Sequence, residues 1–366
     1  PARLFTEGKP TAVGVGDLDG DGKPEIVYAT ASGFDRSLAI LKAEDGGYRV
    51  HAKLPVQAAK SDVDNVVVAD ADQDGKPDIL AFEQLGGLRV FVQGDGGKFA
   101  DVSLSANYGQ GLVRKTRSVG FALGDVTGDG KPEMLIAQGN FARALRLERS
   151  GALQVVDQFN GLTPDSRIEG CAAADLDGDG VNEVLLLDAQ AKVISVLKRQ
   201  ASGAYAIVQN VPVGTIRLRG MTLMDFDRDK SMDVLVFSTD KMVTLLSSAP
   251  HLVLQEIAAY ETETKGGVLA DVSLGDLNGD GRPDLILNES SQNAIEILSY
   301  DRASAAFTLR MRFQVFEKKP FPGRGPRGGE GARIEPRSME IADVTNDGKS
   351  DLILVVHDRL NVYPQD

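Results

Sequence analysis

Short apolar runs alternate with polar segments along the whole chain, without the spacing of a long amphipathic helix. Runs of small and β-branched residues occur at 12–16, 65–69 and 119–124, and each precedes a polar segment. A second apolar run follows the polar segment, for example at 26–29, 79–82, 184–187 and 352–355. Continuous apolar runs of this length are typical of strands buried on both faces, so the pattern predicts pairs of buried strands.

Two further segments complete each unit. An alternating segment such as 88–92 or 145–148 follows the second buried strand, and a fourth segment such as 48–54 or 307–313 closes the unit. Four strands in roughly 50 residues, repeated seven times, predict an all-β fold, a seven-bladed β-propeller with four-stranded blades. Residues 1–366 then form a single propeller domain.

The polar segment between the first two strands repeats a nine-residue pattern. Position one is Asp, position three is Asp, Asn or Thr, position five is Asp, position six is Gly in all copies but one, and position nine is Asp or Glu. The seven copies lie at 17–25, 70–78, 125–133, 175–183, 225–233, 276–284 and 343–351. Their starts are 50 to 67 residues apart, which indicates a repeat protein.

The two ends of the chain complement each other. The last unit has only three predicted strands, at 339–342, 352–356 and 360–363, whereas a spare strand at 2–6 precedes the first motif. Pairing of the spare strand with the last blade would complete that blade and close the propeller. Closure removes sheet edges that would otherwise invite aggregation, so we predict this pairing.

The repeated motif is rich in hard oxygen donors. Side chains at positions one, three and five, a main-chain carbonyl at position seven and a carboxylate at position nine would surround one point, and oxygen-only ligation suits Ca²⁺. Glycine at position six allows the positive φ of a tight loop. An EF-hand is excluded because its last ligand stands at position 12 and helices flank its loop. The predicted calcium ligands are Asp17, Asp19, Asp21, Lys23, Glu25, Asp70, Asp72, Asp74, Lys76, Asp78, Asp125, Thr127, Asp129, Lys131, Glu133, Asp175, Asp177, Asp179, Val181, Glu183, Asp225, Asp227, Asp229, Ser231, Asp233, Asp276, Asn278, Asp280, Arg282, Asp284, Asp343, Thr345, Asp347, Lys349 and Asp351.

The seven predicted sites, which would hold up to seven Ca²⁺ ions, are unequal. Copies one, two and four keep four carboxylates and are expected to bind calcium most tightly. Thr127, Thr345 and Asn278 each replace a carboxylate, which predicts weaker sites. The 225–233 site is expected to be the weakest because Lys230 stands where glycine belongs. We interpret the metal mainly as a structural staple that orders each turn.

These motifs resemble the FG-GAP/VCBS family of repeats, which form the calcium-binding blades of integrin-α-like propellers, and the resemblance covers essentially the whole chain. It implies a seven-bladed propeller with Ca²⁺ on one face, each loop joining the innermost strand to the second strand. It also implies an extracellular, periplasmic or cell-surface location, without specifying a ligand. The chain starts with Pro1 rather than Met, which we interpret as a processed or excised form.

Charge and cysteine content narrow the function. The net charge of −13 argues against nucleic-acid binding, and no apolar run is long enough to span a bilayer. The single cysteine, Cys171, excludes a disulfide framework and is expected in the core. The seven loops contain 25 of the 53 acidic residues, so seven bound Ca²⁺ ions would bring the net charge to +1. An acidic ligand is therefore compatible with the composition.

No catalytic constellation is evident. The three histidines, His51, His251 and His357, show no convergent pattern, and neither a G-x-S-x-G nor a phosphate-binding loop occurs, so no catalytic residue is predicted.

One basic feature stands out from the repeats. Arg117, Arg167 and Arg217 each lie eight residues before the first Asp of copies three, four and five, with Arg114 and Lys115 nearby. They are predicted to form a cationic arc, opposite the calcium loops, for a carboxylate- or sulfate-bearing ligand. The alternative is a set of solvated or locally salt-bridged arginines. The Gly/Pro-rich basic insertion at 318–333 is either a surface loop or a partner-contacting loop.

The function predicted from these features is a non-enzymatic, calcium-binding, extracellular β-propeller that serves as an adhesion or binding module for a protein or glycan. An alternative is an enzyme resembling the propeller polysaccharide lyases that act on acidic glycans, although no dedicated base is evident. A third interpretation is a structural subunit of a larger cell-surface complex.

Overall fold

The computed structural model describes residues 2–365 except 45–46, 215–217, 227, 240, 249–250, 263, 265, 302–303, 305 and 316–334. Arg217, Asp227 and the predicted inserted loop at 318–333 lie outside the described residues.

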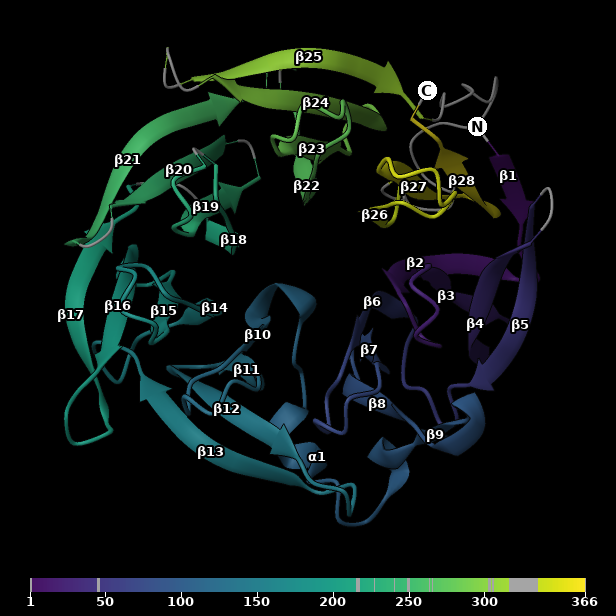
Figure 1. Ribbon diagram of the computed structural model, residues 1–366, viewed down its shortest axis with the longest axis horizontal. Coiled ribbons are helices and arrows are strands. Elements are labelled where there is room, and N and C mark those ends of the chain that lie inside the picture. Colours follow the sequence, from purple (N-terminus) through teal and green to yellow (C-terminus); the bar gives the residue numbers. More distant parts are fainter. Residues whose placement is uncertain are drawn as a thin grey trace, which may run out of the picture. The chain divides into compact units, whose positions relative to one another are not determined.

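Seven four-stranded antiparallel sheets make up the fold (Figure 1). Six sheets contain four strands that are consecutive in the chain, and the seventh has the order β1-β28-β27-β26. The predicted all-β, seven-bladed propeller with four-stranded blades is confirmed. The strands of the first four blades are β2 (Lys9–Gly16), β3 (Glu25–Ser32), β4 (Asp35–Glu44), β5 (Gly47–Pro55), β6 (Val63–Ala69), β7 (Asp78–Glu83), β8 (Gly87–Gln93), β9 (Phe99–Asp101), β10 (Phe121–Gly124), β11 (Glu133–Gln138), β12 (Phe141–Leu147), β13 (Leu153–Asn160), β14 (Ile168–Ala174), β15 (Glu183–Asp188), β16 (Val193–Arg199) and β17 (Tyr205–Pro212). The strands of the last three blades are β18 (Leu218–Met224), β19 (Asp233–Ser238), β20 (Lys241–Ser248), β21 (His251–Glu261), β22 (Leu269–Gly275), β23 (Asp284–Glu289), β24 (Ala294–Asp301), β25 (Ala306–Gln314), β26 (Met339–Ala342), β27 (Asp351–Val356), β28 (Arg359–Tyr363) and β1 (Ala2–Phe5).

Contacts divide the chain into two compact units. One comprises Pro1–Val66, Thr262–Tyr300 and Thr308–Asp366, and the other comprises Val67–Glu261 and Asp301–Phe307. Within the second unit, the first strand β14 contacts the first strands β10 and β18 of the adjoining blades. Within the first unit, β26 likewise contacts β22 and β2. The first strands of successive blades therefore lie side by side within each unit.

The second strand of each blade forms the centre of its packing. Every residue of β7, β15, β19, β23 and β27 is buried, as the continuous apolar runs predict. In β15, for example, Leu185 and Leu187 pack with Val234 and Val236 of the next blade in one hydrophobic cluster. Cys171 on β14 is 3% exposed, which confirms its place in the core.

The seventh blade joins the two ends of the chain. Strand β1 pairs antiparallel with β28, with Ala2 opposite Val362 and Phe5 opposite Arg359. The predicted pairing of the spare strand with the last blade is thus confirmed. It completes the four-stranded sheet.

The connection from β9 to β10 departs from the repeat. It contains the 3₁₀ turns η2 (Val102–Leu104) and η3 (Ser118–Gly120) and the one-turn helix α1 (Gln110–Val113). Gln138 on β11 donates a hydrogen bond from Nε2 to the carbonyl oxygen of Leu112, at 2.7 Å, which holds α1 against the sheet. No helix in the described parts of the chain has the length and apolar character needed to cross a membrane.

Candidate functional site

The buried carboxylate at position nine organises every acidic loop. In each of the seven loops, one of its oxygens accepts a hydrogen bond from the N–H of position two, at 2.7 to 3.2 Å. These carboxylates are at most 3% exposed. Position nine is also the first residue of the second strand, so the strand itself fixes where the carboxylate lies. The seven carboxylates are Glu25, Asp78, Glu133, Glu183, Asp233, Asp284 and Asp351.

Two further aspartates shape each loop. The position-one carboxylate accepts the N–H of position six at 2.6 to 3.0 Å in all seven loops. The position-five carboxylate accepts the N–H of position seven at 2.8 to 3.0 Å. The main-chain N–H groups of the turn have no partner strand, and the aspartate side chains accept their hydrogen bonds instead.

The backbone at positions four and six has a positive φ in the loops, which explains the glycines of the motif. In the first loop, φ is +75° at Gly20 and +85° at Gly22. The fifth loop adopts the same conformation without glycine, with φ of +63° at Arg228 and +75° at Lys230. Side chains with a Cβ rarely adopt this region, so the fifth loop holds two strained residues. Its weaker calcium binding stays a prediction.

Among the described residues, three loops bring carboxylates from positions one, three and nine together, with ligand atoms within 4.8 Å of one another. The three groups, which could each hold a metal ion, are Asp17, Asp19 and Glu25; Asp70, Asp72 and Asp78; and Asp175, Asp177 and Glu183. These are the three copies predicted to bind most tightly. The donors are all carboxylate oxygens, so the residues fit a hard cation such as calcium. Coordination by positions five and seven stays a prediction.

Burial disfavours negative charge at position nine. It raises the pKa of the Asp78 carboxyl to about 6, despite hydrogen bonds from the N–H groups of Gln93 and Ala71. Burial likewise raises the pKa values of Glu25, Glu183 and Asp284. A buried carboxylate that is ionised at neutral pH needs a nearby cation. The acidic side chains of these loops therefore carry negative charge that a cation must compensate.

Among the described residues, basic side chains contact the position-nine carboxylate itself in three loops, and the sequence analysis missed them. Lys198 Nζ lies 2.7 Å from an Asp179 oxygen and 3.2 Å from a Glu183 oxygen. Arg146 Nη2 lies 2.6 Å from a Glu133 oxygen and 2.9 Å from an Asp129 oxygen.

The third such residue is Lys42, whose Nζ donates to Asp19 and lies 3.7 Å from a Glu25 oxygen. Lys42 lowers the pKa of Asp19 chiefly through that hydrogen bond. All three cations stand on the third strand of their blades, within the alternating segments recognised in the sequence. Only the register between the second and third strands places these basic residues opposite position nine, and the sequence pattern does not determine that register.

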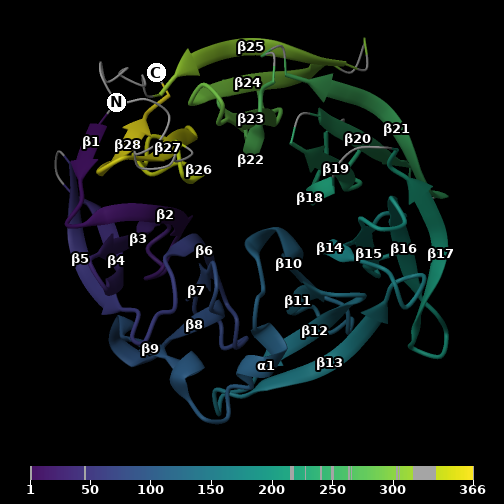
Figure 2. The same ribbon diagram turned by 180° about the vertical axis from the view of Figure 1, so that it is seen from behind.

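A pocket at the opposite end of the third and fourth blades is rich in basic side chains. We call it the cationic pocket: a space of about 570 Å³ lined by Gly111, Arg114, Lys115, Ala137, Gln138, Gly139, Arg167, Ile168 and Glu169. Three cations thus face one carboxylate. Figure 2 shows the strands that support it, β11 and β14, together with α1, from behind. Arg167 precedes β14, whereas the acidic loop 175–183 follows that strand.

Two residues of the predicted arginine arc, Arg117 and Arg167, lie within the described part of the chain. Arg167 Nε lies 3.0 Å from one oxygen of Glu169, and Arg117 Nη1 lies 3.5 Å from the other. Both arginine side chains are more than 60% exposed. Two of the predicted residues therefore share a carboxylate that the sequence analysis missed, in agreement with the salt-bridged alternative, yet remain accessible.

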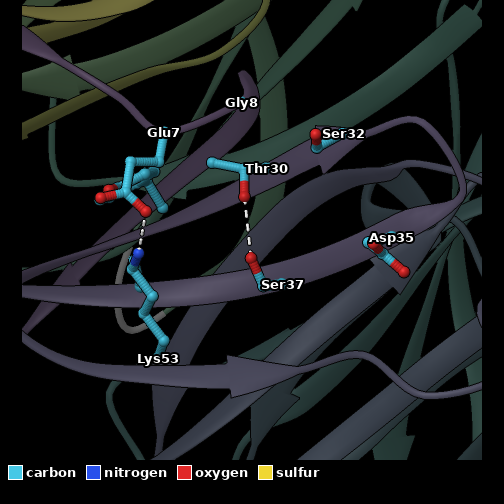
Figure 3. Close-up of a pocket in the computed structure, with 9 residues that line it drawn as sticks. Glu7, Gly8, Thr30, Ser32, Asp35, Ser37 and Lys53 are labelled. Carbon is cyan, nitrogen blue, oxygen red and sulfur yellow. Dashed lines mark hydrogen bonds and ion pairs between the residues drawn. The ribbon is translucent and has the colours of Figure 1, made fainter.

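A second pocket, of about 210 Å³, lies in the first blade (Figure 3). Its lining is polar: the hydroxyls of Thr30 and Ser37 lie 2.9 Å apart in a hydrogen bond across β3 and β4. Glu7 and Lys53 form an ion pair beside them, which compensates their charges. Asp35 also lines this pocket, so its lining combines hydroxyls with carboxylates, whereas the cationic pocket is rich in basic side chains.

Comparison with known proteins identifies the repeats. A family model described as the FG-GAP-like repeat matches residues 17–81, 70–136, 125–186 and 225–287, more than half of the chain. The chain belongs to the FG-GAP-like repeat family. Each match begins at the first aspartate of one acidic loop and ends shortly after the next acidic loop. No curated protein shows significant sequence similarity to this FG-GAP-like chain.

Solved structures share the fold of this FG-GAP-like protein at low sequence identity. A protein from Lactobacillus plantarum superposes with a TM-score of 0.53 and 13% identity, over 84% of this chain and 86% of the other. A rhamnogalacturonan lyase from Bacillus licheniformis superposes with a TM-score of 0.51 and 14% identity, over 100% of this chain and 74% of the other. These likenesses establish a shared fold.

Proposed function

We propose that this FG-GAP-like propeller is a calcium-binding module that acts outside the cytoplasm and recognises an acidic glycan or an acidic protein surface. The observation that carries ligand recognition is the cationic pocket, where Arg114, Lys115 and Arg167 converge on one space. Guanidinium groups bind carboxylates and sulfates with paired hydrogen bonds, which the single pocket carboxylate does not exhaust.

The acidic loops support the calcium part of the proposal. Buried carboxylates in oxygen-only groups favour a hard divalent cation over a transition metal. Calcium-dependent extracellular modules commonly bind their ions with dissociation constants of about 10⁻⁴ to 10⁻³ M, concentrations that the cytoplasm does not provide. Calcium-stabilised loops are therefore best suited to an extracellular, periplasmic or cell-surface location.

Hydrogen bonds hold the loop that carries Arg114 and Lys115 in the cationic pocket. Gln138 holds α1 through the Leu112 carbonyl and also donates to the Arg114 carbonyl oxygen, at 3.3 Å. These hydrogen bonds of Gln138 to the carbonyl oxygens of Leu112 and Arg114 tie this loop to β11. An organised loop loses little entropy on binding, which favours recognition of a charged group.

The test is a glycan array of uronate- and sulfate-bearing oligosaccharides, followed by calorimetry with the best oligosaccharide. The wild-type chain is expected to bind in calcium, and the double variant Arg114→Ala with Arg167→Ala is expected to lose about tenfold or more in affinity. Arg49→Ala provides the matched control, because Arg49 is an exposed arginine on β5. If the double variant binds the oligosaccharide as tightly as the wild type does, the cationic pocket is not the binding site.

An enzyme that cleaves acidic polysaccharides is the second candidate, favoured by the fold shared with the rhamnogalacturonan lyase. Lyase cleavage would produce an unsaturated sugar whose ultraviolet absorbance can be followed. We expect binding of acidic glycans without a rise in absorbance. A steady rise that the double variant abolishes would assign catalysis instead. Co-purification with a fixed partner would favour a structural subunit of a surface assembly.

A further inference from the structure

The seven acidic loops fall into two groups according to the residue at position nine and the residue that faces it. We define the facing residue as the one opposite position nine in the register of the second and third strands. Position nine is Glu in three loops and Asp in four. The facing residues follow from the registers of the strand pairs: Lys42, Arg146 and Lys198 opposite Glu, and Val92, Leu246, Ser299 and Pro364 opposite Asp. Each Glu faces a cation, and each Asp faces an uncharged residue.

In the glutamate loops, the second carboxylate oxygen of position nine contacts a cation on the third strand. One oxygen of Glu183 accepts the N–H of Leu176 at 2.9 Å, as position nine does in every loop. The other oxygen of Glu183 points to the third strand, where Lys198 Nζ lies 3.2 Å away. Glu133 repeats the arrangement, with Val126 N–H at 3.1 Å on one oxygen and Arg146 at 2.6 Å on the other.

Aspartate at position nine receives neutral donors on its second oxygen. Asp78 accepts the N–H of Gln93 at 2.8 Å, and Asp233 accepts the N–H of Ser247 at 2.9 Å. Asp284 accepts the Ser299 hydroxyl at 2.5 Å. In these loops the facing residue therefore adds no positive charge to the carboxylates.

The cation in a glutamate loop reaches beyond position nine. Lys198 also contacts Asp177 and Asp179, which stand at positions three and five of the same loop. Lys42 contacts Asp19 at position three of its own loop. The ammonium groups thus lie among the same carboxylates that would ligate an ion, where a divalent cation would meet both repulsion and a filled space.

We propose that Lys42, Arg146 and Lys198 are built-in counter-cations that take the place of calcium in the three glutamate loops and leave calcium to the aspartate loops. This inference rests on the proposed calcium binding. It changes the expected order of affinities, because loops 17–25 and 175–183 keep four carboxylates but hold an internal cation. Loop 70–78 combines four carboxylates with the uncharged facing residue Val92. Its Lys76 lies 3.6 Å from an Asp74 oxygen but 3.2 Å from Asp95 outside the loop, so we expect it to leave the loop, which becomes the strongest predicted site.

The test uses the full chain after chelation, with calcium chloride as the only added ligand. Calorimetry counts the ions bound, and thermal unfolding is followed with and without calcium. Lys198→Met is expected to lower the Tm in chelator and to recover it in calcium. Its calcium affinity at loop 175–183 is expected to exceed that of the wild type by about tenfold or more, which adds one measurable site. Lys192→Met is the control, since this exposed lysine lies in the β15–β16 turn at the other end of the same blade.

The converse substitution, Val92→Lys, is expected to weaken calcium binding at loop 70–78 by a similar factor. If Lys198→Met does not fold, Lys42→Met tests the same relationship in loop 17–25. Calcium binding that is identical in the wild type and the lysine variants would overturn the counter-cation role while leaving calcium binding intact. Absence of calcium binding in the wild type and every variant would instead overturn the calcium proposal, and this inference with it.

Discussion

Gly14 on β2 lies against the main chain of Val66 on β6, so closely that a Cβ at residue 14 would stand 2.5 Å from the Val66 carbonyl oxygen. Glycine is thus required where these two first strands meet. We expect Gly14→Ala to destabilise the chain by about 1–3 kcal/mol, because the added methyl group must push the strands apart. Urea unfolding measures this change. Gly47→Ala is the control, since its Cβ would meet no atom within 4 Å; equal stability of the two variants would contradict the expected clash.

Calcium removal is expected to lower thermal stability. An ion that binds only the folded chain at 100 times its dissociation constant stabilises it by about 2.7 kcal/mol per site. Melting curves in calcium and in excess chelator measure the total effect. Asp78→Asn is expected to reduce the calcium-dependent part, because loop 70–78 then lacks its buried carboxylate. A Tm that is independent of calcium would argue against stabilising metal sites.

Relief of backbone strain is expected from Lys230→Gly. Lys230 has a φ of +75°, a region that glycine adopts without a Cβ clash. The substitution is expected to raise the free energy of unfolding by about 1 kcal/mol in chelator, as measured by urea unfolding. Asn346→Gly is a matched comparison at φ +60°, with a smaller gain because asparagine tolerates this region. A loss of stability in Lys230→Gly would show that its side chain contributes more than its strain costs.

Glu340 on β26 predicts a pH dependence that is separate from the acidic loops. Burial, together with the nearby Asp271 charge, raises the pKa of the Glu340 carboxyl to about 8. Between the ordinary glutamate pKa and pH 8, the folded chain holds a proton that the unfolded chain releases. The free energy of unfolding should therefore fall as pH rises through this range.

Glu340→Gln is expected to flatten that slope, because glutamine stays neutral at every pH. Urea unfolding at pH 5, 7 and 9 in chelator compares the two proteins. Glu169→Gln serves as the control, since Glu169 is ion-paired with two arginines. Parallel pH profiles for the wild type and Glu340→Gln would rule out the titration of Glu340 as the cause.

The repeated parts of the structure could be predicted from the sequence because each uses the same local chemistry seven times. The aspartates and glycines of the loops fix the turns, and the apolar runs that follow them become the buried second strands. Even the pairing of β1 with β28 followed from a missing strand in the last repeat. Each of these features depends on residues that are close in the sequence or on a simple count.

The remaining features depend on register and on single insertions. Lys198 faces Glu183 only because β15 and β16 pair with Val184 opposite Leu197, a relationship that an apolar pattern leaves undetermined. Helix α1 and its contact with Gln138 belong to a segment with no counterpart in the other described blades. Glu169 drew no attention because it lies outside the motif, yet it joins Arg117 and Arg167.

The pairing of Ala2 with Val362 also has a consequence for folding kinetics. Strand β28 is synthesised after the six blades that separate it from β1, so β1 has no partner while those blades emerge from the ribosome. Joining segments so far apart in the chain carries a large loop-closure entropy, and contacts between distant segments slow folding. The blade made of β1, β28, β27 and β26 is therefore expected to form late, and the edge of β28 stays open until β1 pairs with it.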